Sequence, residues 1–202
     1  QFGNLTRKTH QNTSWDVARF ESCGQKWIDV SEGHYGVSLL NDCKYGHSVR
    51  GGSMALTLIK SGIEPNPVSD QEEHDILYAL YPHAENWRAA GTVAESYNLN
   101  QPALVMEGTA PEGRYSLASV NQPNVIVETI KRAEDGRGVI VRMYESENAK
   151  TKGKLTFCRA FEKAYICNLL EEEEQEAKVT GTEVEFVIRP YEVMTGKLTD
   201  KA

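Results

Sequence analysis

The sequence predicts a mainly β protein, a sandwich of antiparallel strands with about one short helix. Three observations favour this fold: short apolar runs are separated by turn residues, one segment alternates cleanly between apolar and polar residues, and a single segment has helical spacing. The 202 residues are enough for one sizeable domain and marginal for two. We therefore expect one β-sandwich region over residues 1–202, with a small terminal sub-sheet from about 125 to 202.

Short strands are expected through the first part of the chain. The segments SWDVARF (14–20) and KWIDV (26–30) have the apolar content of short strands. The runs YGVSLL (35–40) and MALTLIK (54–60) look like pairing partners. The segment HDILYALYPH (74–83) predicts a further strand, although its length also permits a helix.

One helix is expected in ENWRAAGTVAESYNLN (85–100). Its apolar residues from Trp87 to Tyr97 recur at spacings of three to four, and Pro102 prevents its continuation. The only low-complexity run is EEEEQEAK (171–178). Like charges at this density repel one another in a core, so we expect this run to be a solvated turn or loop tip.

The last third gives the clearest strand signals. In NVIVETIKRAEDGRGVIVRMYES (124–146) two apolar runs flank Glu134-Asp135-Gly136, and Asp-Gly between such runs predicts a hairpin. In TEVEFVIRPYEV (182–193) the apolar residues fall on every second position, and Pro190 favours a strand end.

Composition narrows the classes of function. The net charge of −7 and the sequence pI of about 5.3 argue against a nucleic-acid-binding protein, which needs a basic face. No apolar run approaches the roughly 20 residues that span a bilayer. The four cysteines have no CxxC spacing, which favours free thiols in a reducing compartment.

Specific catalytic motifs are missing from the sequence. It contains no GxSxG elbow, Walker loop, HExxH or GxGxxG. The segment SDQEEHDILYALYPH (69–83) gathers carboxylates with His74 and His83, all of them possible zinc ligands. The alternative is a strand entry with its charges in water. Residues nine apart point to opposite faces of a strand, which argues against this histidine pair as joint ligands.

The connection from Asn41 to Gly52 is the best local candidate for a functional site. It runs twelve residues between two strand-like segments and carries Asp42 and Lys44 among other reactive or polar side chains. The alternative is a polar loop closed by Gly-Gly, in which Asp42 and Lys44 pair with each other.

Four stretches carry a resemblance to a known family. THQNTSWDVARFESCGQKWIDVSEGHYGVSLLNDCKYG (9–46) resembles the start of the C-terminal β region of glycoside hydrolase family 38 α-mannosidases, in particular the cytosolic and bacterial branch. SDQEEHDILYALYPH (69–83) and EDGRGVIVRMYE (134–145) are similar to two further stretches of the family. IRPYEVMTGKL (188–198) resembles its terminal strand.

The resemblance implies a retaining exo-α-mannosidase whose zinc, aspartate nucleophile and acid/base lie in a catalytic domain outside this chain. The partners implied are that domain and mannose-containing oligosaccharides, and the location implied is cytoplasmic. No catalytic or metal-binding residue is assigned here, and this chain alone is expected to be inactive. Asp42 and Lys44 match positions that look over the sugar cleft, although many relatives carry Arg where this chain has Lys44, and lysine cannot make a bidentate contact.

Two other functions remain open. One is a carbohydrate-binding module with its own affinity for sugar, for which exposed tryptophans are the expected platforms. The other is an independent lyase or hydrolase that uses its own carboxylate pair, or a zinc ion held between Asp70 and His83.

Overall fold

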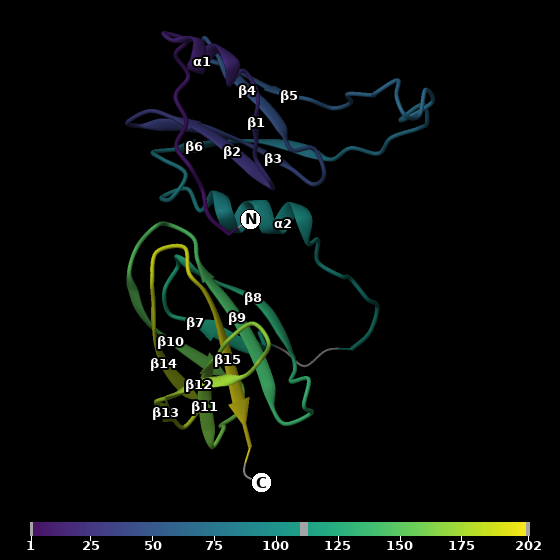
Figure 1. Ribbon diagram of the computed structural model, residues 1–202. Coiled ribbons are helices and arrows are strands. Elements are labelled where there is room, and N and C mark those ends of the chain that lie inside the picture. The colour runs from purple at the N-terminus through teal and green to yellow at the C-terminus, as the bar shows by residue number, and fades with distance from the viewer. Residues whose placement is uncertain (1, 110–112, 201–202) are drawn as a thin grey trace. The chain divides into compact units, whose positions relative to one another are not determined.

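The computed structural model describes residues 2–109 and 113–200, and the chain divides into two compact units (Figure 1). One unit comprises Gln1–Leu5 and Gly108–Ala202, and we call it the sandwich unit. The other, Thr6–Glu107, lies between these two parts in the sequence, and we call it the inserted unit. Both are built mainly from antiparallel strands, which confirms the expected fold class. The single region expected over residues 1–202 remains a prediction, within which the structure distinguishes these two units.

Two sheets form the sandwich unit. Its strands are β7 (Ala118–Val120), β8 (Val125–Arg132), β9 (Val139–Glu145), β10 (Thr151–Phe157), β11 (Lys163–Cys167), β12 (Glu173–Ala177), β13 (Val179–Thr180), β14 (Glu183–Ile188) and β15 (Val193–Thr199). One sheet has the order β13-β14-β10-β7 and the other β12-β11-β15-β9-β8. The inward side chains of both sheets meet in one apolar core, as in a β-sandwich.

Two of the sequence signals account for much of this core. The predicted hairpin is the pair β8–β9, and Gly136 at its tip has the positive φ of 73° that glycine tolerates best. The alternating segment is β14, whose Val184, Phe186 and Ile188 are buried. Burying one such side chain contributes about 1.5–3 kcal/mol, so the alternation has a direct energetic reason.

Residues 2–4 contact the strands and turns of the sandwich unit that lie more than a hundred positions further along the chain. The Phe2 and Tyr144 rings lie 5.0 Å apart between centroids. The Asn4 side-chain amide donates to the Ser146 carbonyl at 2.8 Å, and the Tyr191 hydroxyl donates to Asn4 Oδ1 at 2.7 Å. We call residues 2–4 the strap.

A buried carboxylate organises the turns next to the strap. Glu145 is fully buried and accepts hydrogen bonds from Asn124 Nδ2 at 2.9 Å, the Glu147 amide at 2.8 Å and the Tyr191 amide at 3.0 Å. Burial by itself raises the pKa of Glu145. The hydrogen bonds, above all that from Tyr191, outweigh burial and hold this pKa below its ordinary value of 4.5.

The inserted unit has two small sheets and two helices among its described residues. Its elements are α1 (Ser14–Ala18), β1 (Ser22–Cys23), β2 (Trp27–Ser31), β3 (Tyr35–Asn41), β4 (Gly46–Arg50), β5 (Ser53–Leu56), β6 (Tyr78–Ala84) and α2 (Thr92–Asn100). One sheet has the order β1-β4-β5 and the other β2-β3-β6, with α2 packed on β2 and β3. Figure 1 shows the chain between β5 and β6 running outward from the sheets and back, and we call residues 57–77 the arm.

The expected pairing of YGVSLL with MALTLIK is wrong. Strand β3 lies between β2 and β6, and β5 pairs with β4, a strand that the apolar pattern did not reveal. Gly51 and Gly52, with φ of 54° and 79°, form the tight turn that joins β4 to β5. The twelve-residue connection is therefore a short link, residues 42–45, followed by a hairpin.

The helices also differ from expectation. The segment 14–20 was expected as a strand, but Thr13 and Asp16 form a capping box that starts α1. The helix expected over 85–100 begins only at Thr92, because Gly91 takes a left-handed conformation with φ of 66°. It ends at Asn100, before Pro102 as expected.

The acidic run was expected to be a solvated turn or loop tip; its residues 172–176 are exposed as expected, but most of the run is a strand. Its residues 173–177 form β12 at a sheet edge. Glu173 binds Lys197 Nζ at 3.0 Å, and Glu171, which is mostly buried, binds Lys131 Nζ at 2.8 Å. Lys197 on β15 and Lys131 on β8 thus compensate two of the like charges.

The two units differ strongly in their apolar interiors. Nearly all buried hydrophobic side chains of the described residues belong to the sandwich unit, and the inserted unit contributes only Leu39 and Leu40.

Candidate functional site

The link between β3 and β4 carries the residues that the sequence singled out. Asp42 is held at the root of the arm by two contacts with Leu77. The Asp42 amide donates to the Leu77 carbonyl at 3.2 Å, and the Leu77 amide donates to Asp42 Oδ1 at 3.4 Å. The structure therefore fixes the backbone and the carboxylate of Asp42 together.

The Asp42 carboxylate is kept ionised by its neighbours. A hydrogen bond from the Cys43 thiol and one from the Leu77 amide lower the pKa of Asp42 below its ordinary value of 3.8. The same contact with Asp42 raises the pKa of the Cys43 thiol above 9.0. At neutral pH the link presents a carboxylate acceptor beside a protonated thiol.

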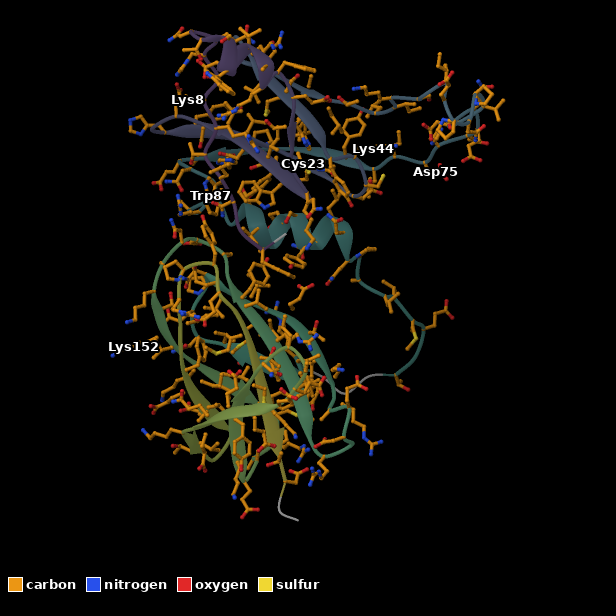
Figure 2. All side chains as sticks on the ribbon, in the orientation of Figure 1. Lys8, Cys23, Lys44, Asp75, Trp87 and Lys152 are labelled. Carbon is orange, nitrogen blue, oxygen red and sulfur yellow. The ribbon has the colours of Figure 1, made fainter. Side chains whose placement is uncertain are left out.

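Lys44 does not pair with Asp42. Among the described residues, no ion pair or hydrogen bond involves the Lys44 ammonium, and its side chain is half-buried. The alternative of an internal Asp42–Lys44 pair is therefore not what this structure shows. Figure 2 shows Lys44 on the side of the inserted unit from which the arm, with Asp75, extends. A carboxylate acceptor and an ammonium donor thus lie two residues apart, and both can form charge-assisted hydrogen bonds.

Polar side chains from β4 and α2 form hydrogen bonds with the backbone of the link and of the residue before it. His47 on β4 is almost fully buried, and its Nδ1 lies 2.9 Å from the Tyr45 carbonyl oxygen, to which it can donate. Burial lowers the pKa of His47 below 6.5 despite the opposing effects of this carbonyl and of Glu21. Asn100, at the end of α2, donates to the Asn41 carbonyl at 3.0 Å. The conformation of the link thus depends on both β4 and α2.

The start of α2 is held by a buried polar cluster. His83 Nε2 lies 2.7 Å from Asp29 Oδ2, and both side chains are almost completely buried. The Ser38 hydroxyl donates to Asp29 Oδ2 at 2.9 Å and lies 2.9 Å from Thr92 Oγ1 on α2. Gly36 leaves room for the His83 ring, which a Cβ at that position would strike.

This cluster does not form a nucleophilic triad, although it contains serine, histidine and aspartate. Ser38 Oγ lies 3.3 Å from His83 Nε2, the same nitrogen that faces Asp29, whereas a triad uses the two ring nitrogens separately. Ser38 is also fully buried. The cluster therefore joins α2 to the sheet and has no access to a substrate.

The proposed zinc ligands are not brought together. His83 faces Asp29 inside the inserted unit, while His74 lies on the arm with its Nε2 2.9 Å from the Asp70 carbonyl. Within residues 2–109 and 113–200, no group of three or more His, Cys, Asp or Glu side chains could hold a metal ion. The described residues thus give no geometric support to a zinc site between Asp70 and His83.

The tryptophans divide into packing and exposed residues. Trp27 and Trp87 stack on each other with centroids 5.0 Å apart. Trp15 on α1 is 75% exposed. Only Trp15 is therefore free to serve as the sugar platform expected of a binding module.

Asp42 and Lys44 stay predicted site residues, and the sequence did not reveal the residues that hold the link around them. Asn100 and His47 are far from the link in sequence or hidden in an unrecognised strand. One signal was available: Ser38 interrupts the apolar run of YGVSLL at a position that faces α2. A polar residue inside an apolar strand predicts a buried hydrogen-bonded partner.

Family comparison assigns both units. Residues 1–68 match the family described as glycosyl hydrolases family 38 C-terminal domain, and residues 124–195 match the glycosyl hydrolases family 38 C-terminal beta sandwich domain. The two ranges together span more than half of the chain. The fold and these matches define the C-terminal part of a glycosyl hydrolase. The chain belongs to family 38 and corresponds to the C-terminal part of its α-mannosidases.

Individual relatives agree with this assignment. The chain is 38% identical over 200 residues to alpha-mannosidase 2C1 of Mus musculus, and 39% identical over 203 residues to alpha-mannosidase G of Dictyostelium discoideum. Each match covers 96% of this chain and 19% of the relative. The chain thus spans about a fifth of the length of these curated relatives.

A solved structure supports the fold. The crystal structure of an alpha-mannosidase from Enterococcus faecalis V583 superposes with a TM-score of 0.76 at 18% identity, covering 99% of this chain and 23% of that chain. Separately, no helix in the described part of the chain is long and apolar enough to cross a membrane.

Proposed function

We propose that this chain is the C-terminal, non-catalytic portion of a retaining exo-α-mannosidase. The observation that carries the proposal is the identity of 37–39% with proteins named α-mannosidases across 96% of the chain. In this proposal the chain packs on the catalytic domain of the same parent, which holds the zinc ion, and the 202-residue chain alone hydrolyses nothing. A cytoplasmic parent is supported by the resemblance and by the four free cysteines.

In the same proposal, Asp42 and Lys44 contact the sugar. Asp42 offers an ionised acceptor whose position is fixed by Leu77, so little entropy is lost when it accepts a sugar hydroxyl. Lys44 offers a donor that no described acceptor already occupies. Because lysine is a point charge on a flexible stem, we expect it to contribute less than Asp42.

The test uses the full-length parent. Asp42→Asn should raise KM for an aryl α-mannoside about 10- to 100-fold, since a charge-assisted hydrogen bond is weakened. Lys44→Gln should raise KM about 3- to 10-fold. The matched controls are Glu174→Gln and Lys163→Gln, at exposed positions of β12 and β11 in the sandwich unit, which should leave KM unchanged. Unchanged KM for Asp42→Asn would remove Asp42 from the cleft, and zinc-dependent hydrolysis by the 202-residue chain alone would overturn the non-catalytic role.

The alternative is a carbohydrate-binding module, and one observation favours it. An open groove of about 780 Å³ runs along the sandwich unit between β12 and the strands β10 and β14, with Asn121, Lys152 and Gln175 among its lining residues. The one aromatic residue that lines this groove, Phe186, is buried, so little of its ring is exposed to stack on a sugar. Titration of the chain with mannobiose separates the two functions: a dissociation constant below millimolar that Gln175→Ala weakens would favour the module.

A further inference from the structure

The inserted unit has too little buried apolar surface to account for its own stability. Only Leu39 and Leu40 are buried hydrophobic residues in this stretch of about a hundred residues, whereas the sandwich unit has a continuous core from both sheets. Burial of apolar surface is the main term that offsets chain entropy. The inserted unit therefore needs an additional partner surface.

The segment around α1 is the first of three exposed apolar surfaces in the inserted unit. None of the five residues of α1 is buried, and Trp15 is 75% exposed, with Val17 and Phe20 also exposed. A helix this short is marginal in water even with a capping box. Packing of Trp15 against another surface would supply the missing stabilisation.

Strand β6 presents a second such surface. It is an edge strand that pairs only with β3, and its outward residues Tyr78 and Leu80 are exposed. Leu80 is 65% exposed although its cross-strand neighbour Leu39 is buried. An edge strand with exposed apolar side chains is typical of an interface.

The arm is the third surface. It carries the exposed side chains Ile59, Ile63 and Val68, of which Ile63 is 79% exposed, and contains no strand or helix of its own. A long connection with apolar side chains in water is unfavourable unless another surface covers them.

We propose that these three surfaces of the inserted unit, rather than the sandwich unit, dock the part of the parent polypeptide that precedes this chain. This inference rests on the proposed function and names the unit that makes the contact. The family matches point to this occupant. Both family descriptions specify C-terminal domains, and about four-fifths of the length of each relative lies outside the part that this chain covers. A missing segment of that size is large enough to cover three separate surfaces.

The first experiment compares amide exchange in the 202-residue chain and in the full-length parent. Exchange in β2, β3 and β6 should be about tenfold slower or more in the parent, while β9, β14 and β15 should change less than about twofold. Equal protection of the inserted unit in both proteins would overturn the proposal. Light scattering is measured on the same sample, and a dimer that protects β6 would replace the preceding chain by a second copy as the occupant.

The second experiment uses two leucines of equal exposure. Leu80 in the inserted unit and Leu169 in the sandwich unit are each 65% exposed. Leu80→Glu should leave exchange in the 202-residue chain unchanged, because its side chain is already in water, but should abolish most of the added protection in the parent. Leu169→Glu should change neither protein. Equal effects of the two variants in the parent would contradict the proposal.

The outcomes separate this inference from the sugar contact. If β6 gains protection in the parent but Asp42→Asn leaves KM unchanged, the proposed docking surface stands and the proposed sugar contact is wrong. If Asp42→Asn raises KM but β6 gains no protection in the parent, the proposed sugar contact stands and the proposed docking surface is wrong.

Discussion

The sandwich unit and the inserted unit have the same class of fold but are stabilised differently. The sandwich unit closes two sheets over one apolar core and places a buried carboxylate, Glu145, where its turns meet. The inserted unit buries few apolar side chains and instead holds α2 with the polar cluster of Asp29, Ser38, His83 and Thr92. The sandwich unit thus has an apolar core of its own, whereas the inserted unit is the one for which we propose a partner surface.

The largest expected effect tests the core of the sandwich unit. Ile188 on β14 has no exposed surface and belongs to the apolar core, so Ile188→Ala should lower the free energy of unfolding by about 2–5 kcal/mol in urea titrations. Leu39→Ala in the inserted unit should cost less, because few buried side chains surround it. Val187→Ala, at an exposed position of β14, is the control and should stay within about 0.5 kcal/mol. Equal costs at positions 188 and 39 would remove the contrast between the units.

A somewhat smaller effect is expected in the polar cluster of the inserted unit. Asp29→Asn should destabilise this unit by about 3 kcal/mol, because His83 and Ser38 would lose a shared buried carboxylate. Hydrogen exchange of the α2 amides measures the loss. The exposed Glu32→Gln is the control, and unchanged exchange in Asp29→Asn would show that the cluster does not hold α2.

Acid should affect the two units in different pH ranges. His47 has a folded-state pKa below 6.5, so the unfolded chain binds the proton more tightly, and the inserted unit should begin to lose stability as the pH falls below 6.5. Glu145 has a folded-state pKa below 4.5, so its stabilisation is complete above 4.5 and is lost as the pH falls through the folded value. Unfolding monitored separately in each unit by exchange between pH 7 and 3 checks both ranges.

Two variants assign these ranges to their residues. His47→Gln should abolish the decline that begins near 6.5, whereas His10→Gln, at an exposed position, should not. Glu145→Gln should lower stability at pH 7 and reduce its dependence on pH below 4.5. Loss of both units in one pH range would contradict the assignment.

The smallest effect concerns the link itself. Asn100→Ala removes the hydrogen bond to the Asn41 carbonyl and should cost about 1 kcal/mol. Because the link then moves more freely, alkylation of the exposed Cys43 thiol should speed up about twofold or more. Asn98→Ala, which removes a hydrogen bond to Glu95 on the same helix, should leave this rate unchanged.

Features that depend on neighbouring residues could be predicted from the sequence, and features that depend on residues far apart along the chain could not. The β8–β9 hairpin and the alternation of β14 depend on neighbouring residues and were predicted correctly. The strand β4 and the pairing of β3 with β6 depend on partners far along the chain, and apolar patterns alone could not supply them. In the candidate site, Asp42 and Lys44 could be singled out from the sequence and their contact with sugar stays a prediction, whereas the hydrogen bonds of His47 and Asn100 to the backbone around them required the three-dimensional structure.

The strap has a consequence for how the polypeptide is made. Asn4 is separated from its partners Ser146 and Tyr191 by 142 and 187 positions along the chain. A ribosome therefore releases residues 2–4 long before their binding surface exists, and they cannot complete their contacts until Tyr191 has been translated. Closing so long a loop costs little more entropy than closing a moderate one, but it delays the last step of assembly.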